Sequence, residues 1–96
     1  IVPSIINTKI ETFILVSLEI KIANTLGLHA RLCSQIAREA GKFESDVYLI
    51  TKNNKIDAKS VLGLLSLCLP SGSNVVLEAS GSDATKAIDD IASIIE

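Results

Sequence analysis

Aromatic side chains are scarce in this sequence, which contains two Phe, one Tyr and no Trp among its 96 residues. Apolar residues still make up 48% of the chain, so its core must be built from Ile, Leu, Val and Ala. A chain of this length can enclose one hydrophobic core but not two. We therefore expect a single small domain with an aliphatic interior.

Clusters of positive charge and long apolar runs are also missing. The formal net charge is −2 and there is no run of Lys or Arg, which argues against binding to the phosphate backbone of nucleic acids. No segment approaches the roughly 18 consecutive apolar residues of a membrane span, and the first residues lack the pattern of a secretory signal. We expect a cytoplasmic protein that binds neither nucleic acid nor membrane.

Metal-binding and disulfide patterns are absent from the sequence. Cys33 and Cys68 are far apart, no Cys-x-x-Cys motif occurs, and His29 is the only histidine. Zinc sites and disulfide frameworks need more numerous or closely spaced ligands. We expect no metal and no cofactor, and two reduced thiols that act as small apolar residues.

Several segments show the alternation or the β-branched composition of strands. They are residues 16–22, 47–51, 55–58 and 74–79. The second and third predict a hairpin, in whose turn Asn53 and Asn54 are expected to take positive φ values.

Helical periodicity appears in the remaining segments. Apolar residues recur on one face between residues 32 and 40, and Gly41 follows as a stop. Residues 84–95 repeat this spacing, with Ser82 as the expected N-cap. A third helix, short and apolar, is expected to begin at Ser60.

The predicted order is strand, helix, strand, strand, helix, strand, helix. One-sided strands and amphipathic helices together predict an α+β domain, an open-faced β-sandwich whose helices cover a single face of the sheet. Residues 1–14 show no clear period and are expected to form an N-terminal extension of uncertain order. The domain is then expected to span residues 15–96.

His29 lies between a predicted turn at Gly27 and the start of the first predicted helix. Unpaired backbone N–H groups converge at a helix start and attract anions. Imidazole is partly neutral, and therefore nucleophilic, near neutral pH, and the guanidinium of Arg31 can bind two phosphate oxygens at once. These residues favour phosphoryl transfer, although a histidine in this place is also compatible with a capping or surface role.

Residues 24–31, with the sequence Asn-Thr-Leu-Gly-Leu-His-Ala-Arg, resemble the active-site loop of the HPr family. These are the histidine-containing phosphocarrier proteins of the bacterial phosphoenolpyruvate:sugar phosphotransferase system. Residues 58–67 resemble the regulatory serine segment of the family, and residues 81–84 resemble the entry to its last helix. The resemblance implies a four-stranded antiparallel sheet covered on one face by three helices, in a phosphoryl carrier and not an enzyme.

The resemblance also assigns roles to residues of this chain. It implies that His29 is phosphorylated on Nδ1 by enzyme I, with phosphoenolpyruvate as the ultimate donor, and passes the group to sugar-specific IIA domains. Arg31 matches the arginine that steadies the phosphoryl group. Ser60 matches the serine modified by the HPr kinase/phosphorylase in carbon catabolite control, where its added charge would disturb docking of acidic partners.

An apolar docking patch for these partner proteins is expected beside His29. We define this docking patch by the residues Leu28, Ala30, Val61, Leu62 and Leu65. We expect the protein to act as a monomer.

The sequence departs from the family where Pro-Ala usually follows His-Ala-Arg, because this chain has Leu32 and Cys33. Proline pre-organises the first turn of a helix, so His29 is expected to be held less firmly. Leu32 also adds a backbone N–H that can point toward the phosphate. A nucleophilic pair of Cys33 with His29 is not favoured, because Cys33 belongs to the apolar stripe that includes Ala37.

Two other functions remain open from the sequence. One is a regulatory HPr-like protein that signals carbon or nitrogen status without sugar transport, and the segment around Ser60 favours the carbon branch over the nitrogen branch. The other is an interaction protein whose His29 is structural.

Overall fold

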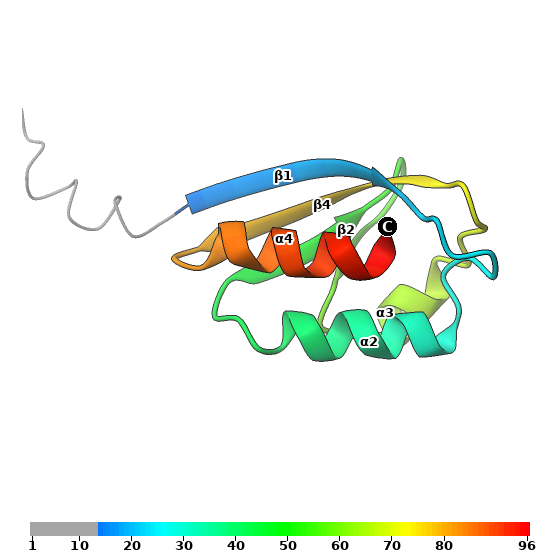
Figure 1. Ribbon diagram of the computed structural model, residues 1–96, viewed down its shortest axis with the longest axis horizontal. Coiled ribbons are helices and arrows are strands. Elements are labelled where there is room, and N and C mark those ends of the chain that lie inside the picture. The colour runs from blue at the N-terminus through cyan, green and yellow to red at the C-terminus, as the bar shows by residue number, and fades with distance from the viewer. Residues whose placement is uncertain (1–13) are drawn as a thin grey trace, which may run out of the picture.

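The computed structural model describes residues 14–96, which form one sheet with all helices on one side (Figure 1). The elements are β1 (Ile14–Lys21), α2 (Ala30–Ala40), β2 (Asp46–Ile50), β3 (Lys55–Asp57), α3 (Val61–Ser66), β4 (Asn74–Gly81) and α4 (Ala84–Ile95). The strand order is β1-β4-β2-β3 and every neighbouring pair is antiparallel. The predicted open-faced sandwich of four strands and three helices is confirmed.

The first 13 residues lie outside the described part of the chain, so the expected extension over residues 1–14 is described only at Ile14, which begins β1. Between residues 14 and 96 no helix is long and apolar enough to cross a membrane.

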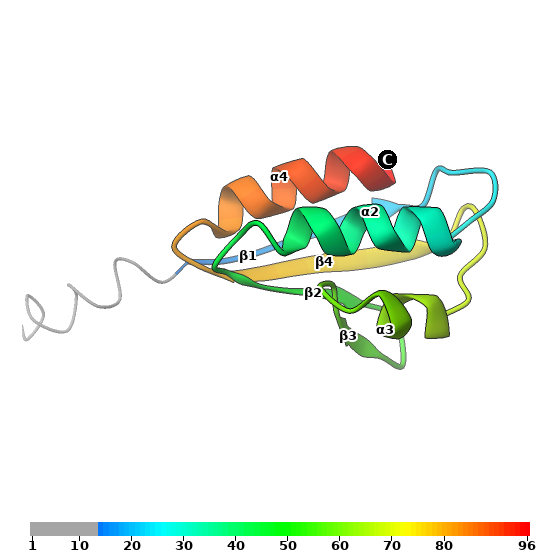
Figure 2. The same cartoon turned by 90° about the horizontal axis from the view of Figure 1, so that it is seen from below.

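The aliphatic core lies between the sheet and the helices. Alternate residues of the central strands face the helices, as the period of two requires, and Leu49 and Leu77 are both 0% exposed. Figure 2 shows α2 and α4 side by side on the sheet, with α3 next to α2 at the side of β3. The amphipathic stripes of α2 and α4 therefore close the core, and no helix of residues 14–96 covers the opposite face of the sheet.

The start of α4 differs from the prediction that Ser82 caps it. Asp83 is the N-cap residue, but its carboxylate makes no hydrogen bond to its own helix. Instead it accepts hydrogen bonds from the backbone N–H groups of Glu44 and Ser45, each at 3.0 Å, and from the Ser45 hydroxyl. Asp83 thus bonds to residues distant in sequence and not to its own helix. These hydrogen bonds join the α2–β2 loop to the segment between β4 and α4.

The hairpin turn also differs from the prediction. Asn53 and Asn54 do not take positive φ values, since Cys68 is the only non-glycine residue between 14 and 96 that does. The turn is closed by the N–H of Thr51, which donates to the carbonyl of Asn54 at 2.8 Å. A local hydrogen bond therefore closes the turn without left-handed backbone.

Candidate functional site

The loop that carries His29 is held by a turn at Asn24. The Asn24 side-chain oxygen accepts a hydrogen bond from the N–H of Leu26 at 2.8 Å, and its carbonyl accepts one from the N–H of Gly27 at 2.9 Å. Gly27 has a φ of +71°, and a Cβ there would lie 2.5 Å from the carbonyl oxygen of Leu69. Glycine is required at this position because the loop touches the backbone of the segment that follows α3.

His29 is the N-cap residue of α2, but its side chain caps nothing. Its N–H donates to the carbonyl of Gly27 at 3.0 Å, and its own carbonyl accepts from Cys33 at 2.9 Å. The half-buried imidazole is therefore not committed to any hydrogen bond with residues 14–96. This backbone fixes where the ring starts and leaves its nitrogens available.

The first turn of α2 offers donors to an anion. The N–H groups of Ala30, Arg31 and Leu32 donate to no acceptor within residues 14–96. The first hydrogen bond of the helix is donated by the N–H of Cys33. The positive end of the helix dipole lies at the same place. Arg31 is exposed and forms no ion pair with any residue from 14 to 96. A phosphoryl group on the imidazole would thus meet backbone donors and a guanidinium.

Leu32 and Cys33 anchor this turn in the core. The side chain of Leu32 is 2% exposed. Its packing in the core therefore holds the first turn of α2, at the position where the family usually has a proline ring. The thiol of Cys33 is fully buried beside the carbonyl of Leu28, and burial raises its pKa. Cys33 therefore stays a thiol and is no nucleophilic partner for His29.

Ser60 caps α3, as its sequence position predicted. Its Oγ accepts a hydrogen bond from the N–H of Gly63 at 3.0 Å, and the residue is half-buried. The loop over residues 22–29, the start of α2 and α3 lie together at one end of the molecule (Figures 1 and 2). We call this the His29 end.

The docking patch is largely at the surface of the His29 end. Leu62 is 80% exposed, Ala30 is exposed, and Val61 and Leu65 are half-buried against the core. Leu28 is the exception, because its side chain is only 5% exposed and belongs to the core cluster. Its place at the surface was wrongly predicted, and the docking patch is hereafter Ala30, Val61, Leu62 and Leu65.

Leu26 is an exposed apolar residue of the loop and lies outside the predicted docking patch. Its side chain is 74% exposed. It belongs to no helical or strand period, so no sequence pattern indicates its exposure. Only the path of the loop, with Leu28 turned inward, shows which leucine remains outside.

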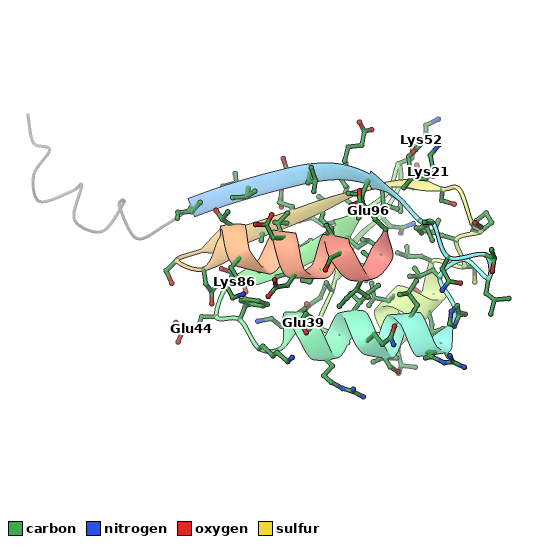
Figure 3. The ribbon with its side chains drawn as sticks, viewed as in Figure 1. Lys21, Glu39, Glu44, Lys52, Lys86 and Glu96 are labelled. Atoms are coloured by element: carbon green, nitrogen blue, oxygen red, sulfur yellow. The ribbon has the colours of Figure 1, made fainter. Side chains whose placement is uncertain are left out.

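Negative charge is excluded from the segments that build the His29 end. Residues 21–38 and 59–76 contain no Asp or Glu, although the chain as a whole has 11. Figure 3 shows Glu39 farther along α2 and Glu44 beyond the end of that helix, both away from the loop over residues 22–29. Glu96 is nearer, because it follows Ile95, whose carbonyl accepts a hydrogen bond from the N–H of Ala23 at 3.3 Å. The segments over residues 21–38 and 59–76 themselves add no negative charge that would oppose a phosphoryl group or an acidic partner surface.

A family model described as the PTS HPr component phosphorylation site matches residues 16–96. Among curated relatives, the HPr-like protein Crh of Bacillus subtilis is 34% identical over 82 residues, which cover 85% of this chain and 96% of Crh. The phosphocarrier protein HPr of Cupriavidus necator is 39% identical, covering 77% of this chain and 83% of the relative. The phosphocarrier protein NPr of Shewanella violacea is 36% identical, covering 81% and 86%.

Solved structures share the same fold. The phosphocarrier protein HPr from Bacillus anthracis superposes with a TM-score of 0.82 and 28% identity, covering 85% of this chain and 98% of that one. Crh from Bacillus subtilis superposes with a TM-score of 0.68 and 35% identity, covering 83% and 92%, and its structure is described as a dimer with a swapping domain.

Proposed function

The chain belongs to the HPr family of phosphocarrier proteins, and on that premise we propose that His29 receives a phosphoryl group from enzyme I and passes it to IIA domains of sugar permeases. Phosphoenolpyruvate is the ultimate donor in this proposal. The observation that carries it is His29 itself, an N-cap residue whose imidazole and the three backbone N–H groups that follow it make no hydrogen bond with residues 14–96.

The proposed transfer uses the lone pair of Nδ1 of His29. Nδ1 attacks the phosphorus while the bond from phosphorus to the donor breaks, and that electron pair leaves with the donor. Such transfers depend mainly on alignment and on stabilising charge on the phosphoryl oxygens. The N–H groups of Ala30, Arg31 and Leu32 and the Arg31 guanidinium would supply that stabilisation.

The test is phosphorylation of the intact protein by enzyme I and phosphoenolpyruvate, followed by mass spectrometry. Wild type should gain the mass of one phosphoryl group, in an adduct that is labile in acid and stable in base. His29→Ala should gain none. Equal gain in both proteins, or none in either, would contradict the proposal.

We also propose that Ser60 is phosphorylated by the HPr kinase/phosphorylase with ATP. A phosphate there retains an acceptor for the N–H of Gly63, so α3 should keep its cap. It also places negative charge beside the docking patch. Ser60→Asp should therefore slow phosphorylation of His29 without unfolding the protein, while Ser60→Ala should abolish labelling by the kinase and leave acceptance from enzyme I intact.

A regulatory role without sugar transport is the second candidate, because the relatives include both Crh and NPr. Transfer from phosphorylated His29 to purified IIA domains separates the two. Rapid transfer to a sugar-permease IIA domain supports the first role, and phosphorylation without such transfer supports the second.

We propose that the protein acts as a monomer in the cytoplasm. The dimer described for Crh makes this worth testing, and β1 exposes Leu15 at 63% on the outermost strand of the sheet. Sedimentation at rising protein concentration should show one species with the mass of a single chain. A concentration-dependent shift to twice that mass would contradict it.

A further inference from the structure

Leu26 is held in a fixed position three residues before His29. The side-chain oxygen of Asn24 accepts a hydrogen bond from the N–H of Leu26. Gly27, which has no Cβ, allows the backbone to pass close to the carbonyl oxygen of Leu69. Leu28 is then buried in the core. The loop thus presents Leu26 outward between two fixed points, and its side chain takes no part in the core cluster.

The exposed leucines of the His29 end lie on different elements. Leu26 is on the loop and Leu62 is on α3, with exposures of 74% and 80%. Figure 2 shows the start of α2 between that loop and α3. His29 is the N-cap residue of α2, so it starts the helix that lies between the element exposing Leu26 and the element exposing Leu62. Only Leu62 belongs to the docking patch.

We propose that Leu26 is a docking residue for the protein that donates the phosphoryl group to His29, and this inference rests on the proposed function. Its partner is a protein surface with an apolar recess rimmed by carboxylates. The charges argue for such a surface, because Lys21 and Arg31 are exposed on either side of the loop and residues 21–38 and 59–76 contain no acidic residue. An apolar side chain flanked along the chain by two cations, Lys21 and Arg31, fits a recess of that chemistry.

The consequence is an effect on association and not on the transfer step. Leu26→Ser should raise the KM of enzyme I for this protein about tenfold, since moving a leucine side chain into an apolar recess strengthens binding by that order. The kcat should change less than twofold. Phosphorylation by phosphoramidate, a small donor that needs no docking, should proceed at the wild-type rate.

Matched variants separate docking from general damage. Leu26→Met keeps an apolar side chain and should restore a KM close to that of wild type. Leu15→Ser removes a leucine that is 63% exposed on β1, at the far end of the molecule (Figure 1), and should leave KM unchanged. Thermal unfolding of Leu26→Ser should match wild type, because the side chain is not in the core.

Each outcome has one meaning. A wild-type KM for Leu26→Ser would overturn the docking role and leave phosphorylation of His29 standing. Slowed reaction of Leu26→Ser with phosphoramidate would also overturn it, because the loop itself would then be altered. Failure of wild type to accept phosphate from enzyme I would overturn the proposed function.

Discussion

Arg31 places beside His29 both a positive charge and the planar fork of a guanidinium. A substitution that keeps one and removes the other separates their contributions. Arg31→Lys keeps the charge but loses the planar fork. We expect the rate of phosphoryl transfer to fall about tenfold, since one charge-assisted hydrogen bond contributes about 1.5 kcal/mol. Stopped reactions analysed by mass would measure it. Arg38→Lys, at another exposed arginine of α2, is the matched control and should transfer at the wild-type rate.

The backbone at the start of α2 makes a prediction that needs no mutation. On phosphorylation of His29, the amide protons of Ala30, Arg31 and Leu32 should shift downfield in NMR spectra, because they gain a charged acceptor. The amide of Cys33 should move less, because it already donates to the carbonyl of His29. An unmoved Leu32 signal would show that this extra N–H takes no part.

At the scale of the elements, Asp83 joins the α2–β2 loop to the start of α4. Its pKa is lowered, first by the hydrogen bond from the Ser45 hydroxyl and then by the bond from the N–H of Glu44. The folded protein therefore binds its proton less readily than the unfolded chain. This stabilisation is complete above the usual value of 3.8 and is lost as the pH falls below it.

Asp83→Asn should consequently be less stable than wild type at pH 7. The difference in free energy of unfolding should shrink as the pH falls below 3.8. Urea unfolding at several pH values measures both curves, and Asp89→Asn on the exposed side of α4 serves as control. A gap that stays constant down to the lowest pH would contradict the role of the ionised carboxylate.

Periodicity predicted the strands and helices because burial on one face repeats along each of them. It failed where a contact distant in sequence decides, as at Asp83, whose partners lie in the α2–β2 loop. The site shows the same division. Glycine and histidine at a helix start could be read from the sequence, but the inward turn of Leu28 and the exposure of Leu26 depend on the approach of the loop to Leu69.

For the whole molecule, the separation of charge predicts how association responds to salt. The chain is acidic overall, yet the segments of the His29 end lack carboxylates. The value of kcat/KM with enzyme I should fall several-fold between about 0.05 M and 0.5 M salt, because screening weakens attraction to an acidic partner. The phosphoramidate reaction should be far less sensitive. Equal sensitivity would mean that salt acts on the transfer step itself.

The strand order has a consequence for how the chain is made. Within residues 14–96, β1 is bonded only to β4, pairing Ile14 with Gly81 and Lys21 with Asn74. The first of these strands to leave the ribosome must therefore wait for the last. Until β4 emerges, the backbone N–H and C=O groups of β1 have no partner strand. Pairing of strands that are far apart in the sequence slows folding. The sheet is completed only after all of β4 has emerged.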